Sequence, residues 1–217
     1  MRNRWLAPIC ILAMLAFSAA VYGRLPAIVP SHWGVDGQVN GTMSRTWGAL
    51  FTPALATLVW LLMLVLPRID PRHDSYAAFA GTLQLFVNIL MLFLALLHVG
   101  MLGVALGWNI PMPRIVIAGV GLLFAALGNE LGRIKPNWFV GIRTPWTLAD
   151  PEVWRRTHRA GGRLFVAIGL LFVLAGALLP FELTAAIVLA GVAVILVFSF
   201  GYSYLAWRQL AKGAAGR

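Results

Sequence analysis

The densest group of charged side chains in this sequence lies between Gly128 and Arg163. This segment holds seven of the 17 Lys and Arg residues of the chain. They are Arg133, Lys135, Arg143, Arg155, Arg156, Arg159 and Arg163. Clustered guanidinium groups bind carboxylates and phosphates, so Arg143, Arg155 and Arg159 are candidates for docking a cytoplasmic partner with acidic groups or a lipid headgroup. The alternative is that these cations only orient the protein and anchor it to an anionic leaflet.

Asp150 marks the predicted start of a helix within this segment. Its side chain suits the N-cap, Pro151 suits the first helical position, and Glu152 favours the positive end of the helix dipole. Glu152 and Arg156 form an i, i+4 pair of opposite charge. The helix is expected to continue into the apolar run that follows.

Glu130 is a carboxylate at the end of an apolar run, where an unpaired charge is costly. An ion pair with Arg159 or Arg163 is the preferred interpretation. The alternative is a proton or ion site that Gln84 and Asn88 help to line.

Metal and catalytic motifs are weak or absent in this sequence. His32 and Asp36 are only two candidate ligands, and His73 with Asp70 and Asp74 is a slightly richer set, but neither reaches a typical metal site. No Gly-rich phosphate loop, HExxH motif or GxSxG elbow is present. We therefore expect no metal site, no cofactor and no enzymatic activity, and a metal- or lipid-dependent membrane enzyme is the least favoured alternative.

The composition is that of an integral membrane protein. Hydrophobic residues make up 60% of the 217 residues and charged residues only 11%, whereas a soluble domain has about 25% charged residues. The sequence predicts an all-α, polytopic fold with about six transmembrane helices. The predicted spans are Trp5–Tyr22, Trp47–Leu66, Ser75–Pro113, Ile115–Leu131, Leu164–Leu179 and Leu183–Leu205.

The third predicted span, Ser75–Pro113, has no charged residue and is too long for one upright helix. We expect a single long or tilted helix that is weakened near Gly100, Gly103 and Gly107. Three polar residues lie near one face of this helix and are candidates for the interior of the bundle. They are Gln84, Asn88 and His98.

Residues 23–46 form a polar, Pro- and Gly-rich segment between the first two spans. Asp36-Gly37 and Asn40-Gly41 are turn signals, so a small hairpin packed on the membrane surface is expected. The candidate binding residues of this loop are Pro30, His32, Asp36 and Gly37.

The distribution of cations predicts the orientation. If the N-terminus is cytoplasmic, the cytoplasmic segments hold 14 of the 17 Lys and Arg residues, so both termini are expected in the cytoplasm. The net charge of +10 therefore indicates membrane topology, and no direct contact with nucleic acid is expected. Trp146 and Trp154 are either anchors of the docking surface or interfacial belt residues. The predicted belt contains Trp5, Trp47, Trp108, Trp138, Trp154 and Trp207.

Three motifs within and around the basic segment resemble the SdpI family, the immunity proteins of the sporulation-delaying toxin system. They are GNELG at 128–132, KPNWFVGIRTPWTL at 135–148 and VWRRTHRAGG at 153–162. The first loop is similar to the domain of unknown function often found at the N-terminus of that family. We accordingly divide the chain into a two-helix unit, 1–76, with an extracytoplasmic loop at 23–46, and a four-helix unit, 77–217, with a basic cytoplasmic loop at 132–163.

The resemblance implies a bacterial inner-membrane protein that gives resistance to a secreted, membrane-active toxin peptide. It also implies a signalling role in which toxin binding recruits a cytoplasmic repressor to the basic loop. The candidate partner-binding residues of that loop are Asn129, Glu130, Asn137, Arg143, Thr144, Pro145, Trp146, Thr147, Trp154, Thr157, His158 and Arg159.

The alternative function is a small membrane transporter or exporter that uses Glu130 and the intramembrane polar residues. Few intramembrane charges and no convincing inverted repeat speak against it. The expected partners are membrane lipid, a toxin peptide on the outer face and a repressor on the inner face. The sequence leaves the oligomeric state open.

Overall fold

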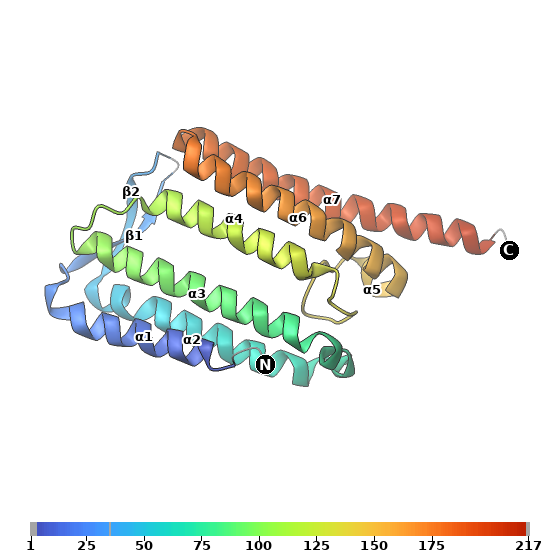
Figure 1. The fold of residues 1–217 in the computed structure, drawn as a ribbon, viewed down its shortest axis with the longest axis horizontal. Coiled ribbons are helices and arrows are strands. Elements are labelled where there is room, and N and C mark those ends of the chain that lie inside the picture. The colour runs from blue at the N-terminus through green and yellow to red at the C-terminus, as the bar shows by residue number, and fades with distance from the viewer. Residues whose placement is uncertain (1–3, 35, 216–217) are drawn as a thin grey trace.

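The computed structural model describes residues 4–34 and 36–215, and within them six long helices form a bundle with a β-hairpin at one end (Figure 1). The long helices are α1 Leu6–Val21, α2 Arg45–Ile69, α3 Ala80–Ala105, α4 Met112–Leu131, α6 Pro151–Leu178 and α7 Phe181–Ala215. The shorter elements are η1 Tyr22–Arg24, β1 Ile28–Trp33, β2 Val39–Ser44, η2 His73–Phe79 and α5 Pro145–Ala149. All six long helices are apolar and long enough to cross a bilayer. The expected polytopic, all-helical membrane fold is confirmed.

The helices form two groups that meet along α3 and α4. Helix α3 packs mainly on α1 and α2, whereas α4, α6 and α7 pack on one another (Figure 1). We call the end that carries β1 and β2 the hairpin end. The opposite end carries the α2–α3 link, residues 132–150 and the projecting C-terminal part of α7, and we call it the basic end. The division at residues 76 and 77 stays a prediction.

The third span ends earlier, and the fourth begins earlier, than predicted. Helix α3 starts at Ala80, after the 3-10 helix η2, and ends at Ala105, so the region is a single span as predicted but its predicted end at Pro113 is wrong. Gly107 has a φ of 87° and the Trp108 N–H donates to the Gly103 carbonyl at 2.9 Å. This left-handed cap ends the helix, and a short loop then leads into α4 at Met112.

The polar loop forms the expected hairpin, with β1 and β2 paired antiparallel. Gly37, with a φ of 76°, provides the turn, and the Gly34 N–H donates to the Gln38 carbonyl at 2.8 Å. The second predicted turn, Asn40-Gly41, is wrong because both residues lie in β2, where Gly41 pairs with His32. The register set by the first turn leaves no place for a second one.

Two pairs of glycines allow the backbones of α4 and α6 to touch. A Cβ atom on Gly128 would lie 2.6 Å from the Gly162 carbonyl oxygen, and one on Gly121 would lie 2.5 Å from the Gly169 oxygen. The pairs are seven residues apart on each helix, so they fall on one seam. Small residues at such a seam are the usual basis of close helix packing in membranes.

We expect Gly169→Ala to destabilise the protein by about 1–3 kcal/mol, because the added methyl group must push α6 away from the α4 backbone. Thermal unfolding of the detergent-purified protein measures the effect. Gly201→Ala in α7 is the matched control, since no atom lies within 4 Å of its Cβ position. Equal melting temperatures for the two variants would contradict the close contact of α4 and α6.

Candidate functional site

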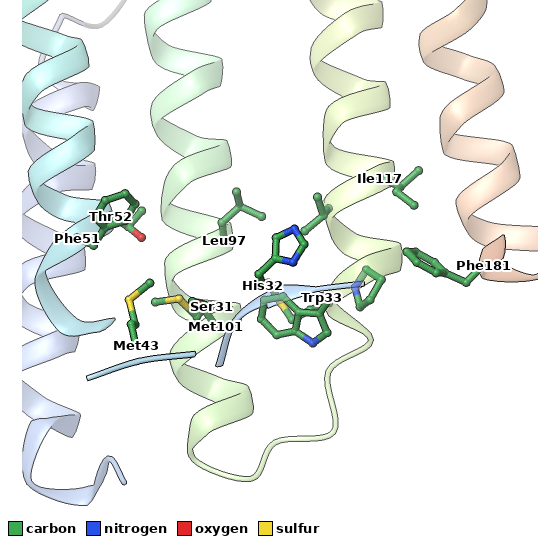
Figure 2. A pocket seen from close by; sticks show the side chains of 13 residues that line it. Ser31, His32, Trp33, Met43, Phe51, Thr52, Leu97, Met101, Ile117 and Phe181 are labelled. Atoms are coloured by element: carbon green, nitrogen blue, oxygen red, sulfur yellow. The ribbon is translucent and has the colours of Figure 1, made fainter. Parts of the chain in front are cut away.

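A cavity of about 330 Å³ lies between the hairpin and the helices beneath it (Figure 2). Its walls are mainly apolar and come from the hairpin and from α2, α3, α4 and α7. The lining residues are Ser31, His32, Trp33, Met43, Phe51, Thr52, Leu97, Met101, Met112, Pro113, Val116, Ile117 and Phe181. Three of them are methionines, whose flexible side chains adapt to ligands of irregular shape.

The hairpin contributes the polar part of this cavity. His32 projects from β1 into the space between α3 and α4, as Figure 2 shows, and its Nδ1 is hydrogen-bonded to Asn40 Oδ1. Pro30 lies in the same strand, half-buried and opposite Thr42. Of the expected loop residues, His32 therefore lines the cavity and Pro30 lies in the same strand.

The tip of the hairpin rests on the start of α7. A Cβ atom on Gly37 would lie 3.7 Å from the Phe181 ring, so the turn is in close reach of that side chain. Asp36 Oδ1 accepts the Gln38 N–H at 3.0 Å, which makes its carboxylate a turn-forming group. Asp36 therefore stabilises the turn from outside the cavity.

His98 joins three helices below the hairpin. The Ser18 hydroxyl of α1 donates to the Ala49 carbonyl of α2 at 2.7 Å, and Ser18 Oγ lies 2.8 Å from His98 Nε2. Because the hydroxyl proton is already used, Nε2–H of His98 must donate to Ser18. His98 is fully buried, so it supports the floor of the hairpin end.

At the basic end, the loop 132–144 is folded around the buried side chain of Asn137. Its Oδ1 accepts the N–H groups of Phe139 and Val140 at 2.9 and 2.6 Å, and its Nδ2 donates to the carbonyls of Lys135 and Val140 at 2.9 Å each. The Asn137 side chain therefore satisfies backbone N–H and C=O groups that have no partner in a helix or strand.

Asp70 connects this loop to the link between α2 and α3. One carboxylate oxygen accepts the Arg72 N–H at 2.7 Å, and the other accepts the Tyr76 hydroxyl at 2.8 Å and the Trp138 N–H at 2.9 Å. Burial by itself would raise the pKa of Asp70, but these hydrogen bonds and the nearby Arg72 guanidinium hold the pKa below its usual range. Asp70 is only 1% exposed. Its structural role was not predicted, because no local pattern links it to a loop some 67 residues later.

Trp154 and His158 form a buried stack on the first turns of α6. Their rings lie 4.0 Å apart, and the Trp154 indole N–H donates to the Ile134 carbonyl at 2.9 Å. His158 Nε2 accepts the Ile142 N–H at 2.9 Å while its Nδ1 bonds the Trp154 carbonyl at 2.8 Å. The prediction that Trp154 anchors an exposed surface or an interfacial belt is wrong, because its indole is buried and hydrogen-bonded to the loop.

Three threonines of the predicted partner-binding set are also buried. Thr144 caps α5 by accepting the Thr147 N–H at 3.2 Å, ahead of Pro145 at the first helical position, and its hydroxyl donates to Ser203 of α7 at 2.9 Å. Thr157 is fully buried in α6. As exposed contacts for a partner these threonines are wrong, and the hydrogen bonds of Thr144 and Thr147 instead fix α5 to the loop and to α7.

The exposed part of the candidate site is a shallow hollow of about 220 Å³ between α4 and α6. Asn129, Arg159 and Arg163 line it. Arg156 bonds Glu152 at 2.8 Å, as predicted, and Arg155 bonds the same carboxylate at 2.6 Å, so the charge of both arginines is partly neutralised. The hollow therefore holds the least neutralised of the arginines in α6.

Two further candidates lie at the edge of this surface. The Arg143 guanidinium is exposed and donates to the Trp138 carbonyl. Trp146 is half-buried against Tyr204 of α7, with 5.2 Å between the ring centroids.

Glu130 does not form the predicted ion pair with Arg159 or Arg163. Its Oε1 lies 2.6 Å from Arg133 Nη1, and its Oε2 accepts the Thr82 hydroxyl of α3 at 2.9 Å. Arg133 follows Glu130 by three residues and therefore reaches it within the same turn. The bond to Thr82 adds a second polar contact between the two helix groups.

Gln84 and Asn88 form a hydrogen-bonded pair on α3. The Gln84 amide donates to Asn88 Oδ1 at 2.9 Å, and Gln84 lines a cavity between α2 and α3. Thr82, which bonds Glu130, and Gln84 are two residues apart and thus lie on different faces of α3. A proton or ion site that Glu130 shares with Gln84 and Asn88 stays a prediction.

In the part of the chain that the structure describes, no group of three or more His, Cys, Asp or Glu side chains could hold a metal ion. The His73 imidazole lies 3.0 Å from the carboxylate of the neighbouring Asp74, at the surface. His32 and Asp36 are each engaged in the hairpin contacts described above.

We expect Asp70→Asn to lower the stability of the folded protein by about 1–3 kcal/mol. Asparagine has only one acceptor oxygen, whereas the two oxygens of Asp70 accept hydrogen bonds from Arg72, Tyr76 and Trp138. The native carboxylate has a lowered folded pKa, so its stabilisation is present above the unfolded Asp pKa of about 3.9 and is lost as the pH falls through the folded value. The melting temperature, measured between pH 7 and pH 3, should fall more steeply for the wild type than for Asp70→Asn. Asp74→Asn, with a 95% exposed side chain, is the control that should behave like the wild type.

Comparisons with known proteins match two separate parts of the chain. Residues 133–203 match the SdpI/YfhL protein family, and residues 9–57 match a domain of unknown function, DUF1648. The chain is 25% identical over 161 residues to Immunity protein SdpI of Bacillus subtilis (strain 168), which covers 73% of this chain and 75% of that protein. No solved structure shows a significant match. Residues 133–203 therefore resemble the SdpI/YfhL family and residues 9–57 resemble DUF1648, in a chain whose six candidate spans make it a multi-pass membrane protein.

Proposed function

We propose that this protein gives a bacterium immunity to a secreted, membrane-active toxin peptide, and that it binds the peptide in the cavity under the hairpin. The observation that carries this proposal is the cavity itself, which an ordered hairpin covers and four helices of both groups line. The similarity to an immunity protein of Bacillus subtilis supports an immunity function.

The cavity has the chemistry that an apolar peptide requires. Most of its walls are aliphatic, aromatic or methionine side chains, and Ser31 and His32 add a few polar atoms from β1. Such a lining takes up the large side chains of a membrane-active peptide, while the polar atoms orient its backbone. A toxin peptide bound in this cavity would have its apolar side chains covered by the protein and would not insert them into the surrounding lipid.

The orientation that suits this function places the hairpin end outside the cell. Arg24, Arg45 and Arg114 lie at the hairpin end, and the other Lys and Arg residues that the structure describes lie toward the basic end. The positive-inside rule then puts the basic end in the cytoplasm of an inner-membrane protein. A peptide arriving from outside meets the hairpin first.

The basic end offers a docking surface for a cytoplasmic partner, such as a repressor, with acidic groups. This surface consists of Asn129, Arg159 and Arg163 in the hollow between α4 and α6, with Arg143 exposed nearby. Arginines bind carboxylates with two parallel hydrogen bonds. The buried loop residues hold this surface in place and do not themselves contact the partner.

We expect Val116→Trp to abolish most of the protection, because the larger ring fills the cavity that receives the peptide. The measurement is survival of a sensitive bacterium that expresses the protein under a panel of membrane-active peptides. Leu122→Trp on the same helix is the matched control, since this side chain is 59% exposed on the outside of the bundle. Full protection by a membrane-inserted Val116→Trp protein would remove the hairpin-end cavity as the binding site.

We expect the double variant Arg159→Glu/Arg163→Glu to lose recruitment of an acidic cytoplasmic partner while it keeps protection. Reversing both charges turns attraction into repulsion at the hollow, and each exposed contact contributes roughly 1 kcal/mol or less. Co-purification of cytoplasmic proteins with the membrane-embedded chain measures the effect. Arg208→Glu/Lys212→Glu in α7 is the control with the same change in net charge, and equal losses in both variants would contradict a specific surface.

A further inference from the structure

A second large cavity, of about 400 Å³, lies between the two helix groups and has no part in the proposed peptide binding. Its walls come from α2, α3, α4 and α6, and the loop 139–142 lies at its basic end. Apart from Gly141, the lining consists of aliphatic, aromatic and methionine side chains. The lining includes Phe86, Leu90, Leu123, Leu127 and Phe165.

The cavity has the depth of one bilayer leaflet. On α4 its lining runs from Leu123 to Leu131, which at 1.5 Å per residue is about 12 Å of helix. On α3 it reaches Leu90, a similar distance from the start of that helix at Ala80. The hydrocarbon core of a bilayer is about 30 Å thick, so the cavity reaches from the basic end to near its middle.

Cations stand where this apolar space meets the basic end. The loop segment Phe139–Ile142 lines the cavity, and exposed Lys135 and Arg143 flank that segment in the same loop. Arg143 is held in place by its bond to the Trp138 carbonyl. An apolar slot of one-leaflet depth with two cations at its end matches an acyl chain below a phosphate group.

We propose that an anionic phospholipid of the leaflet at the basic end occupies this cavity, with an acyl chain between the helix groups and its phosphate at Lys135 and Arg143. Water does not fill an apolar space of this size, and the surrounding bilayer supplies hydrocarbon that restores the lost packing contacts. The lipid completes the contact between two helix groups that otherwise meet along α3 and α4. The inference does not depend on the immunity function.

Native mass spectrometry of the purified full chain tests the acyl-chain part of this proposal. The protein is reconstituted with mixed phosphatidylglycerol and phosphatidylcholine and then stripped with excess detergent. We expect one retained phosphatidylglycerol per wild-type chain and its loss from Leu127→Trp, whose indole fills the cavity. Leu122→Trp, an outward-facing position on the same helix, should keep the lipid.

The headgroup part is tested with exposed residues, so that folding is not at risk. Lys135→Gln and Arg143→Gln should each weaken the preference for phosphatidylglycerol over phosphatidylcholine roughly fivefold, since one cation near an anionic lipid contributes about 1 kcal/mol. Arg68→Gln, an exposed cation of α2 at the same end, should leave the preference unchanged.

Three results would overturn the proposal. They are a wild-type chain that retains no phospholipid, a Leu127→Trp chain that retains as much as the wild type, and an Arg68→Gln change as large as that of Lys135→Gln. The first two show that the cavity holds no lipid chain. The third shows that the preference for anionic lipid comes from the whole basic surface and not from this site.

Discussion

The arrangement of the basic end depends on one buried carboxylate. Asp70 receives hydrogen bonds from Arg72, Tyr76 and Trp138, and through them it joins the α2–α3 link to the loop folded around Asn137. A buried carboxylate is tolerated only when its acceptor sites are filled, so the two segments must keep this geometry together. The hydrogen bond between Thr82 of α3 and Glu130 of α4 joins the two helix groups at a second place, within the bundle.

The two ends of the bundle consequently have different properties. At the basic end, side-chain hydrogen bonds fix an irregular loop, and seven of the twelve predicted partner-binding residues are buried. At the hairpin end, the cavity is lined by apolar contacts and by flexible methionines, which are not directional and adapt to a guest. The first end is suited to hold a fixed surface, and the second to receive an apolar ligand of irregular shape.

Many local features of this protein follow from the sequence. The Asp150-Pro151-Glu152 signal marks the start of α6, and Asp36-Gly37 forms the turn of the hairpin, because caps and turns depend on neighbouring residues. For Glu130 and Trp154, local sequence patterns did not predict the contacts that the structure shows. Glu130 bonds Arg133, which follows the end of α4, and Trp154 is turned inward, because packing of α6 on α4 decides which face of each helix is accessible.

The sequence by itself determined that the chain spans a membrane six times, that a hairpin follows the first span, and that cations gather at one end. These properties depend on composition and on short-range patterns. Only the tertiary structure decided that Asp70 meets Trp138, that glycines bring α4 and α6 into backbone contact, and that one cavity lies under the hairpin and another between the helix groups. Contacts between residues far apart in the chain depend on how the helices pack, and no local pattern records that packing.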